Sequence, residues 1–472
     1  MRKVLTRDEM RAADAAALAA VSHETLVTRA GTAVAHAALR LLGGAYGRRV
    51  VVVAGKGSNG ADGRVAASVL ARRGARVQIL EAQDPAAGPG VVLPPCALVI
   101  DGAYGTGFRG RYDAPRPPAG AAVLAIDIPS GVDADSGEAP GEAVQADVTV
   151  TFAALKPGLL QGDGAVLAGA VEVAHIGIAC GVPKVLLVTD ADIDVLPARA
   201  RDGNKWTHAV GVAAGSAGME GAAVLCTRGA MAAGAGMVRL APPGDPAAAW
   251  PTEAVRVHLP AEGWASPFLE STAKCKVLVV GPGLGIGEAT AAEIRSVVAQ
   301  APVPLVVDAD ALRALGTASQ ARAVLAGRSA PTVLTPHDGE YARLAGRPPG
   351  PDRVGAARRL AEETGAVVLL KGPLTAVAAP DGDPKLPDVV LAGAGVPALA
   401  TAGSGDVLAG IIAAFVARGL APRLAAALAA HVHGRAAALG PTEGLVSGDL
   451  PGLVARVLSE ARHDAGHAGA DG

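Results

Sequence analysis

"RRVVVVAGKGSNGADG", residues 48–63, decides the fold expected for the N-terminal part of the chain. Its unbroken run of valines at 50–53 is typical of a strand that is buried on both faces of a parallel sheet. The glycines that follow predict a tight turn into a helix, at the sheet edge where open α/β folds bind their ligands. Because the spacing is not GxGxxG, a plain strand-to-helix turn explains this loop equally well when it is taken alone.

Similar apolar runs recur downstream and alternate with helical or loop segments. Two amphipathic helices, near 7–20 and 24–42, precede the opening stretch, and Thr6 with Glu9 has the spacing of a capping box. Further strands are expected at "RVQILEA", "ALVID", "AVLAID", "DVTVTFA" and "AVEVAHI", which together span 76–176. This alternation predicts a doubly wound α/β sheet.

A second series of the same kind follows a polar, aperiodic segment near residue 192. Strands are expected at "AVGVAAG", "MVRLA", "KVLVVG", "PLVVDAD", "TVLTP" and "AVVLLK", between Ala-rich helices. A chain of 472 residues exceeds what one core usually serves, so two domains are expected. We place them at 1–191 and 192–460, with a disordered tail at 461–472.

Composition excludes several classes of protein. A net charge of −2 and an aromatic content of 2% argue against a nucleic-acid partner. The sequence has no uninterrupted apolar run long enough for a membrane span, so no membrane partner is expected. Its four cysteines form no CxxC pair, which fits the reducing cytoplasm and indicates neither a zinc site nor a disulfide framework. Homo-oligomerisation is left open.

Two more motifs place aspartates at strand ends. "VIDGAYGTGFRG" and "AIDIPSG" put Asp101 and Asp127 there, each followed by small residues that allow a ligand to approach the backbone. Three such strand ends predict one pocket. We assign Asp127 as an acid–base residue and Lys156 as its electrostatic helper. The alternative is that Asp127 only forms a turn before Pro-Ser-Gly.

Taken as a set, these motifs and "TFAALKPGLL" resemble the epimerase domain of the NAD(P)H-hydrate repair enzymes, over residues 5–178. The resemblance implies a Rossmann-like domain that epimerises NAD(P)HX, the hydrated form of NADH or NADPH. It also implies a potassium ion held by Asn59, Asp101 and Ser130, whose oxygen atoms suit a hard cation. The implied NAD(P)HX-binding residues are Ser58, Asn59, Gly60, Ala61, Asp62, Gly105, Thr106, Gly107, Phe108, Arg109, Gly110, Arg111 and Asp127.

The C-terminal motifs "VVGPGLGIG", "VVDADAL", "VLTPHDGE", "LLKGPLT" and "TAGSGD" resemble, in this order, the ribokinase-like ADP-dependent NAD(P)H-hydrate dehydratases, over residues 195–458. Taken singly, each has an ordinary explanation, such as a turn cap for His337 or a strand end for Lys371. The resemblance implies that NAD(P)HX contacts Ala222, Gly283, His337 and Asp406. It implies that ADP, the co-substrate, contacts Lys371, Gly372, Pro373, Leu374, Thr375 and Gly405.

Asp406 sits where a helix N-terminus would otherwise attract phosphate. In phosphoryl transfer a carboxylate commonly accepts the proton of the attacking hydroxyl, while glycine amides stabilise the transferring group. The resemblance implies that the C6 hydroxyl of NAD(P)HX attacks the β-phosphate of ADP, with Asp406 as the base. Mg²⁺ is expected as the counter-ion of the nucleotide. Simple capping of the helix by Asp406 is the alternative.

Two other functions are left open by the sequence. The C-terminal domain could be a kinase of a vitamin precursor or a sugar. The N-terminal domain could be a non-catalytic ligand-binding or scaffold module, because Ser58 and Ala61 stand where the family usually has Asn and Gly.

Overall fold

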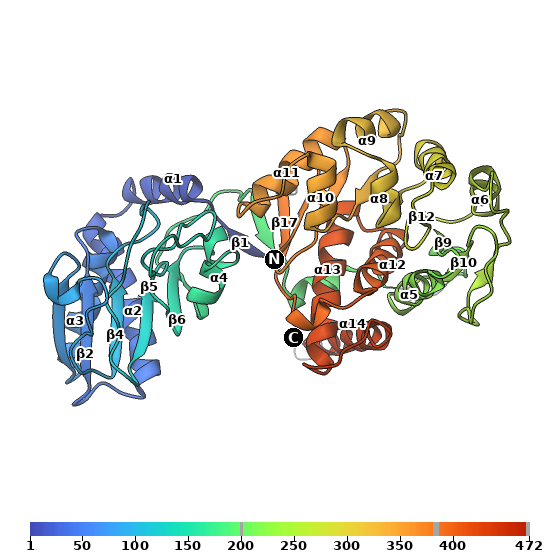
Figure 1. The fold of residues 1–472 in the computed structure, drawn as a ribbon. Coiled ribbons are helices and arrows are strands. Elements are labelled where there is room, and N and C mark those ends of the chain that lie inside the picture. The colour runs from blue at the N-terminus through green and yellow to red at the C-terminus, as the bar shows by residue number, and fades with distance from the viewer. Residues whose placement is uncertain (199–201, 381–386, 469–472) are drawn as a thin grey trace. The chain divides into compact units, whose positions relative to one another are not determined.

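The computed structural model describes residues 1–198, 202–380 and 387–468. The chain divides into two compact units, which are the N-terminal unit, Arg2–Lys184, and the C-terminal unit, Val185–Gly472 with Met1 (Figure 1). The division falls after Lys184 rather than after residue 191. The reason is that β8 (Val185–Leu187) pairs in parallel with β17 (Val389–Ala392), a strand of the C-terminal sheet.

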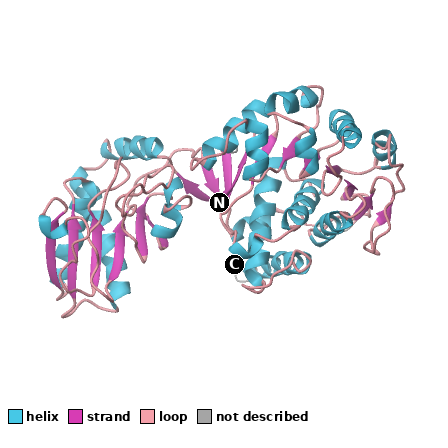
Figure 2. Cartoon of the chain, viewed as in Figure 1, coloured by secondary structure: helices cyan, strands magenta, loops and turns pink. Residues whose placement is uncertain are grey.

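The N-terminal unit is built on a parallel sheet with the strand order β3-β2-β4-β5-β6-β7. Figure 2 shows these strands lying side by side. All the strands predicted for this part of the chain are confirmed: β2 (Arg49–Ala54), β3 (Arg76–Glu81), β4 (Leu98–Gly102), β5 (Ala122–Ile126), β6 (Val148–Phe152) and β7 (Ala170–Ala174).

The two faces of this sheet are covered differently. On one face, Val50 and Val52 pack in a single apolar cluster with residues of α2 (His23–Leu42) and α3 (Ser58–Arg72). On the other face, Val51 and Val53 pack under loop residues, because within residues 82–147, all of them described, helical structure is confined to η1 (Pro85–Ala87). The shorter elements of the unit are β1 (Arg2–Val4), α1 (Arg7–Leu18), η2 (Pro157–Leu159) and α4 (Gly164–Leu167).

Local signals in the sequence explain where the first helices begin and end. The predicted capping box is present, with Thr6 accepting from the Glu9 backbone and Glu9 accepting from the Thr6 backbone. Ser22 caps α2, and Gly43 ends it in the left-handed conformation with φ 62°. The two expected helices are therefore confirmed.

The C-terminal unit has a larger sheet, with the order β8-β17-β16-β15-β14-β13-β12-β9-β10-β11. The predicted strands are confirmed as β9 (Ala209–Ala213), β10 (Met237–Leu240), β12 (Val277–Val280), β13 (Leu305–Val307), β14 (Thr332–Leu334) and β15 (Val367–Leu370). Four strands of this sheet were not predicted: β8, β11 (Val255–Arg256), β16 (Thr375–Ala378) and β17. Strand β16 runs antiparallel to both β15 and β17, so the sheet is mixed at this end.

Helices cover both faces of the larger sheet (Figure 1). On one face α5 (Glu220–Ala232), α12 (Ser404–Ala417), α13 (Pro422–Leu439) and α14 (Leu450–Ala468) share an apolar core with the strands. Helix α12 is buried from Val407 to Ala417 and lies at the centre of this core. The remaining helical elements are η3 (Asp190–Val195), α6 (Ala265–Ser271), α7 (Glu288–Gln300), α8 (Asp310–Ala314), α9 (Ala318–Leu325), α10 (Asp338–Ala345), α11 (Arg353–Thr364) and η4 (Pro397–Leu399).

Helix α14 continues through 461–468, part of the segment expected to be a disordered tail. Its first turns are anchored by the buried side chains of Leu450, Val454 and Val457. Residues 469–472 of the expected tail lie outside the described residues. Among the described residues, none of the helices combines the length and the hydropathy needed to cross a lipid bilayer.

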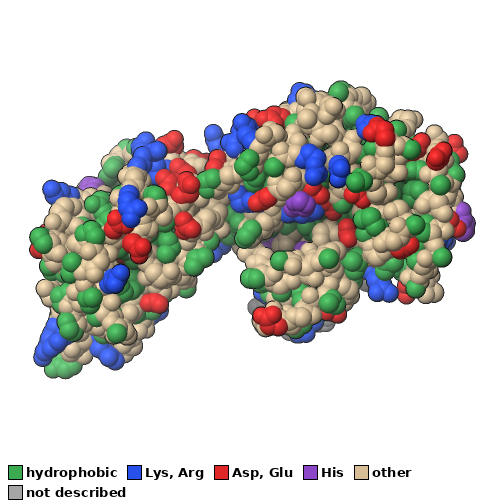
Figure 3. All heavy atoms as spheres, viewed as in Figure 1, with side chains coloured by type: hydrophobic (Ala, Val, Ile, Leu, Met, Phe, Trp, Pro, Cys, Tyr) green, Lys and Arg blue, Asp and Glu red, His purple; other side chains and the backbone are tan. Residues whose placement is uncertain are grey.

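Basic and acidic side chains are interspersed over the surface in view (Figure 3). This mixture agrees with the small net charge of the chain, −2. It supplies no argument for a polyanionic partner.

Candidate active sites

The N-terminal unit has a cavity of about 780 Å³ where β2, β4 and β5 end. Lys56, Tyr104 and Asp127 line it together with residues from α1 and α2. Of the predicted site residues, those that line it are Ser58, Asn59, Asp62, Gly105, Thr106, Gly107, Phe108, Arg109 and Asp127. The other predicted residues of this half do not line it: Gly60, Ala61, Asp101, Gly110, Arg111, Ser130 and Lys156.

Several of these residues have another task. Gly60 packs against the chain, because a Cβ there would lie 1.9 Å from the Gly55 carbonyl oxygen. Arg111 is exposed and pairs with Asp113, with two hydrogen bonds of 2.9 Å. Gly110 lines a separate surface pocket with Asp133. These three residues therefore do not border the cavity.

Asp127 and Lys156 form a buried ion pair at the bottom of the cavity. The Lys156 Nζ atom lies 2.5 Å from the Asp127 Oδ1 atom, and the Lys156 side chain is fully buried. Lys156 also donates to the Thr151 hydroxyl at 2.8 Å and to the Phe152 carbonyl at 3.0 Å. The Thr151 hydroxyl in turn donates to Asp127 Oδ1 at 3.0 Å. All three donors of this ammonium group are thus used, which is what a buried lysine requires.

The backbone of Asp127 is left-handed, with φ 68°. Asp adopts this conformation more readily than most residues, so the turn expected from Pro-Ser-Gly is present. Asp127 combines that turn with the ion pair, and neither excludes the other. It is the tertiary contact with Lys156, 29 positions away, that separates it from an ordinary turn residue.

Two further carboxyl groups line the same cavity. Asp62 is 4% exposed, and burial followed by the charge of Asp127 raises its pKa to about 8. The pKa of Asp14 is also raised, by burial and by Asp127, against an opposing effect of Lys156. Asp14 was not predicted, because only the packing of α1 brings its side chain to the cavity. The site therefore holds acidic groups in different environments.

The three predicted potassium ligands lie close together. The Ser130 hydroxyl donates to Asp101 Oδ1 at 2.7 Å, and the Ser130 amide donates to Asp101 Oδ2 at 2.8 Å. The side-chain amide of Asn59 donates to the carbonyls of Ile126, at 2.6 Å, and of Tyr104, at 3.2 Å. The cluster offers a carboxylate, a hydroxyl, an amide and backbone carbonyls. These oxygens suit a hard cation better than a transition metal.

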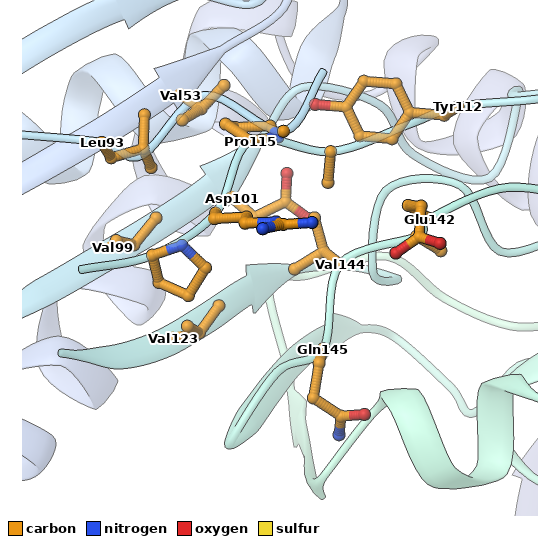
Figure 4. A pocket seen from close by; sticks show the side chains of 15 residues that line it. Val53, Leu93, Val99, Asp101, Tyr112, Pro115, Val123, Glu142, Val144 and Gln145 are labelled. Atoms are coloured by element: carbon orange, nitrogen blue, oxygen red, sulfur yellow. The ribbon is translucent and has the colours of Figure 1, made fainter. Parts of the chain in front are cut away.

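Asp101 also lines a smaller cavity, of about 180 Å³, on the loop-covered face of the sheet. Figure 4 shows Tyr112 and Val144 close to Asp101 there. Burial raises the pKa of Asp101 to about 6. Burial and the Asp101 charge also raise the pKa of Tyr112, whose hydroxyl has no hydrogen-bond partner among the described residues. Of the predicted ligands, Asn59 thus borders the larger cavity and Asp101 the smaller one.

In the C-terminal unit, the start of α12 carries the residue on which the predicted chemistry depends. Gly403 begins the helix with φ 87°, and no side chain caps it. Asp406 lies in the first turn, where burial and then the charge of Asp308 raise its pKa to about 7, against an opposing effect of Lys371. The capping alternative for Asp406 therefore lacks its hydrogen bond. A carboxyl group with this pKa can accept a proton near neutral pH.

Lys371 lies beside this helix start and pairs with Asp308. Its Nζ atom is 2.6 Å from Asp308 Oδ1, which also accepts from the Thr335 hydroxyl at 2.7 Å. Burial alone lowers the pKa of Lys371, but Asp308 and then Glu340 more than offset that effect, so the pKa is raised. A Cβ at Gly405 would lie 3.2 Å from Lys371 Nζ. A permanently charged ammonium group therefore sits at the N-terminus of α12.

The other residues predicted to contact NAD(P)HX in this unit are Ala222, Gly283 and His337. Gly283 is left-handed, with φ 63°, and a Cβ there would lie 3.0 Å from Cβ of Ala222, so these two residues are neighbours. His337 caps α10, because its Nδ1 accepts from the amides of Gly339 and Glu340 at 3.0 and 3.3 Å. The turn-cap alternative for His337 is therefore observed. Its ring remains 61% exposed.

The predicted nucleotide segment forms the turn between β15 and β16. Arg353 holds this turn by donating to the carbonyls of Lys371 and Leu374. A Cβ at Gly372 would overlap the Arg353 guanidinium. The Leu374 side chain is buried, so only its backbone is available to a ligand. Thr375 begins β16, and its hydroxyl donates to the Gly372 carbonyl at 3.4 Å. The Pro373 carbonyl lies against Gly395, where a Cβ would be 3.2 Å from its oxygen.

Sequence reasoning missed several charged residues of this site. Asp308 and Asp310 follow β13 directly, and an acid at a strand end was the same signal that singled out Asp127. Asp310 accepts from the Gly285 amide at 2.8 Å and so links the start of α8 to the glycine loop after β12. His433 lies in α13, where burial and then Lys371 lower its pKa to about 4. Its Ala-rich surroundings give no sequence signal for such a position.

Comparisons with known proteins agree with the two-unit organisation. A family model described as NAD(P)H-hydrate dehydratase matches residues 210–459, and one described as YjeF-related protein N-terminus matches 23–93 and 81–158. The chain is 40% identical to the bifunctional NAD(P)H-hydrate repair enzyme Nnr of Mycobacterium leprae, over 98% of this chain and 99% of that protein. It is 37% identical to the enzyme of the same name from Moorella thermoacetica, over 87% of each.

One solved structure supports the fold of the C-terminal unit. It is a ribokinase-like superfamily protein from Enterococcus faecalis, which is 21% identical and covers 60% of this chain and 98% of its own, with a TM-score of 0.51. At that level of identity the likeness concerns the fold alone. It confirms the ribokinase-like prediction.

Proposed function

This chain belongs to the family of bifunctional NAD(P)H-hydrate repair enzymes, and from that premise we propose how its residues divide the work. The N-terminal unit epimerises the R and S forms of NAD(P)HX, and the C-terminal unit dehydrates the S form to NADH or NADPH. A kinase of a vitamin precursor or a sugar is not favoured, because relatives that span both units carry the repair name.

Asp406 is the single observation that carries the assignment of the dehydration site. Its carboxyl group, with a pKa of about 7, lies in the first turn of a helix whose amides are open to a phosphate. We infer that it takes the proton of the substrate hydroxyl as that oxygen attacks the β-phosphate of ADP and AMP leaves. Loss of phosphate from the intermediate then restores the nicotinamide ring.

Lys371 and the amides near Gly405 would stabilise the charge that develops on the transferring phosphoryl group. Asp308 keeps the Lys371 ammonium in place through its 2.6 Å contact. Mg²⁺ would supply further charge neutralisation on the nucleotide when it is bound. The charges of Asp308 and Asp310 both act on Asp406, and Mg²⁺ prefers such oxygen ligands.

For epimerisation, the 780 Å³ cavity is large enough for the nicotinamide half of the substrate. The N-terminus of α3, at Ser58, offers amides to a phosphate group, and Asp127 lies at the bottom. We propose potassium at Asn59, Asp101 and Ser130, where it would fix the loop that contains Tyr104. All four cysteines are unpaired, which suits the reducing cytoplasm as the site of this repair.

The test follows both half-reactions in the full-length chain. With S-NADHX, Mg²⁺ and ADP, the absorbance of NADH should return and AMP should form in equal amount. Without ADP, chromatography of pure R-NADHX should show conversion to the S form faster than in buffer alone. If ADP gave a phosphorylated product but no NADH, the C-terminal unit would be a kinase, and this proposal would fail.

A further inference from the structure

We propose that Asp62 is the proton donor of the epimerisation, and that Asp127 acts beside it as an ion-paired carboxylate. The inference rests on the proposed function of the N-terminal unit and assigns a catalytic residue to it. The argument begins with hydrogen bonding, because the two carboxyl groups line one cavity but differ completely in their partners.

Asp127 is committed to donors on its Oδ1 atom. Lys156 donates to it at 2.5 Å, the Thr151 hydroxyl at 3.0 Å and the Phe152 amide at 3.4 Å. A carboxylate that accepts a hydrogen bond from a buried ammonium group is held in its charged form. The Oδ1 atom of Asp127 is therefore occupied by the Lys156 ammonium group and two further donors.

Asp62 has the opposite environment. It lies in the first turns of α3, it is 4% exposed, and its carboxyl group has no hydrogen-bond donor among the described residues. The negative charge of Asp127 further disfavours ionisation of Asp62, and burial and that charge together raise its pKa to about 8. Two acids whose environments differ in this way usually divide the roles of acid and base.

The chemistry of the substrate requires such a donor. The hydroxyl-bearing carbon of NAD(P)HX is bonded to the ring nitrogen. When Asp62 protonates the hydroxyl, the carbon–oxygen bond breaks, water leaves, and the nitrogen lone pair forms a carbon–nitrogen double bond. Water then adds from the opposite face, a new carbon–oxygen bond forms, and the released proton returns to Asp62. The step is redox-neutral, and Asp127 stabilises the cationic ring between the two events.

Other charged groups face the same cavity and set the field around Asp62. They are Asp14 on α1, His23 on α2, Lys56 before α3, Arg109 in the loop after β4, and the pair of Asp127 with Lys156. The charges of both Asp127 and Lys156 act on the pKa of Asp14, in opposite directions. The charge that acts on the pKa of Asp62 is that of Asp127. Asp62 is therefore the group on which the negative charge acts without a compensating cation.

The experiment measures conversion of R-NADHX to S-NADHX by the full-length chain without ADP, from about pH 6 to about pH 9. The wild-type rate should fall as the pH rises through about 8, because the protonated form of Asp62 is required. Asp62→Asn should lower the rate by a factor on the order of 10² to 10⁴. Asp62→Glu should retain more activity and the fall at high pH. In heavy-oxygen water, the product should carry the label.

Controls separate this inference from the proposed function. Asp8→Asn, at a side chain that is 87% exposed on α1, should leave the rate unchanged. Dehydration of S-NADHX by the Asp62 variants should match that of the wild type, which shows that each chain is folded. An Asp62→Asn rate within threefold of wild type, or epimerisation without label, would overturn the role of Asp62. A wild-type chain that fails to epimerise would instead refute the proposed function of the unit.

Discussion

The two sites of this chain each place a lysine among aspartates, but they pair them differently. In the N-terminal unit, Lys156 contacts Asp127, the residue assigned to catalysis. In the C-terminal unit, Lys371 contacts Asp308, and Asp406, the assigned base, has no ion pair with any described residue. The choice of partner decides which acid stays charged and which can exchange a proton near neutral pH.

The consequence is that equivalent-looking aspartates have different tasks. Asp127 directly follows β5, and Asp406 ends the motif "TAGSGD". Asp127 pairs with Lys156, whereas burial and then the charge of Asp127 raise the pKa of its neighbour Asp62 to about 8. Asp406 itself has the raised pKa, because burial and then the charge of Asp308 outweigh the opposing effect of Lys371. The following predictions test this contrast.

The largest effect is expected for Asp406→Asn. Loss of the general base should lower the rate of S-NADHX dehydration by a factor on the order of 10² to 10⁴, while ADP still binds. The absorbance of NADH measures the rate, and equilibrium dialysis measures ADP binding. Epimerisation should be unaffected. Asp194→Asn, at an exposed acid of the same unit, is the matched control, and near-wild-type turnover of Asp406→Asn would refute its role.

Lys156→Met should destabilise the N-terminal unit by about 3 to 5 kcal/mol, because it leaves the Asp127 charge buried without its partner. Denaturant unfolding of the full-length chain measures this as a shift of the N-terminal transition. Lys184→Met, at an exposed lysine of the same unit, should cause no shift. A variant as stable as wild type would mean that the ion pair with Lys156 does not stabilise the buried Asp127. The proposed difference between the two sites would then be refuted.

The two glycine-rich loops should respond differently to alanine. Gly60→Ala should cost about 1 to 3 kcal/mol or more in the free energy of unfolding, because its Cβ would overlap the Gly55 backbone. Gly405→Ala should cost less stability, since its Cβ would meet the side chains of Lys371, at 3.2 Å, and Asp308, at 3.9 Å, rather than backbone atoms. Its effect should instead be a weaker affinity for ADP. Equal losses of stability in both variants would contradict this distinction.

The smallest effect concerns the pH dependence of dehydration. Asp406 must be deprotonated to act as a base, and its pKa is raised to about 7. The rate should therefore rise about tenfold per pH unit below that value and level off above it. Epimerisation should show the opposite trend through about pH 8. Parallel pH profiles for the two reactions would break the comparison between the sites.

Much of the architecture could be predicted because buried parallel strands carry a strong local signal. The valine run of β2 and the apolar runs of β12 and β15 show it clearly. Strands β16 and β17 were not predicted, because short antiparallel strands beside a turn lack a long apolar run. The boundary was placed too late for a related reason: β8 is three residues long and is defined only by its pairing with β17.

The candidate sites were predictable to the extent that a motif lies at the end of one strand. Ser58, Gly105 and Asp127 line the cavity as the motifs indicated. His337 was predicted to contact NAD(P)HX, but its ring also caps α10 by accepting hydrogen bonds from two backbone amides. Asp14 could not be found at all, because its position depends on how α1 packs.

The sequence by itself determined the order of strands and glycine loops, and with them the presence of acids at strand ends and at the start of α12. Only the tertiary structure decided which charges meet, since Lys371 and Asp308 are 63 positions apart and Lys156 and Asp127 are 29. The physical reason is that the pKa of an ionisable group depends on its burial and on the charges beside it. Crossover connections of a parallel sheet set both, and they join residues that are distant along the chain.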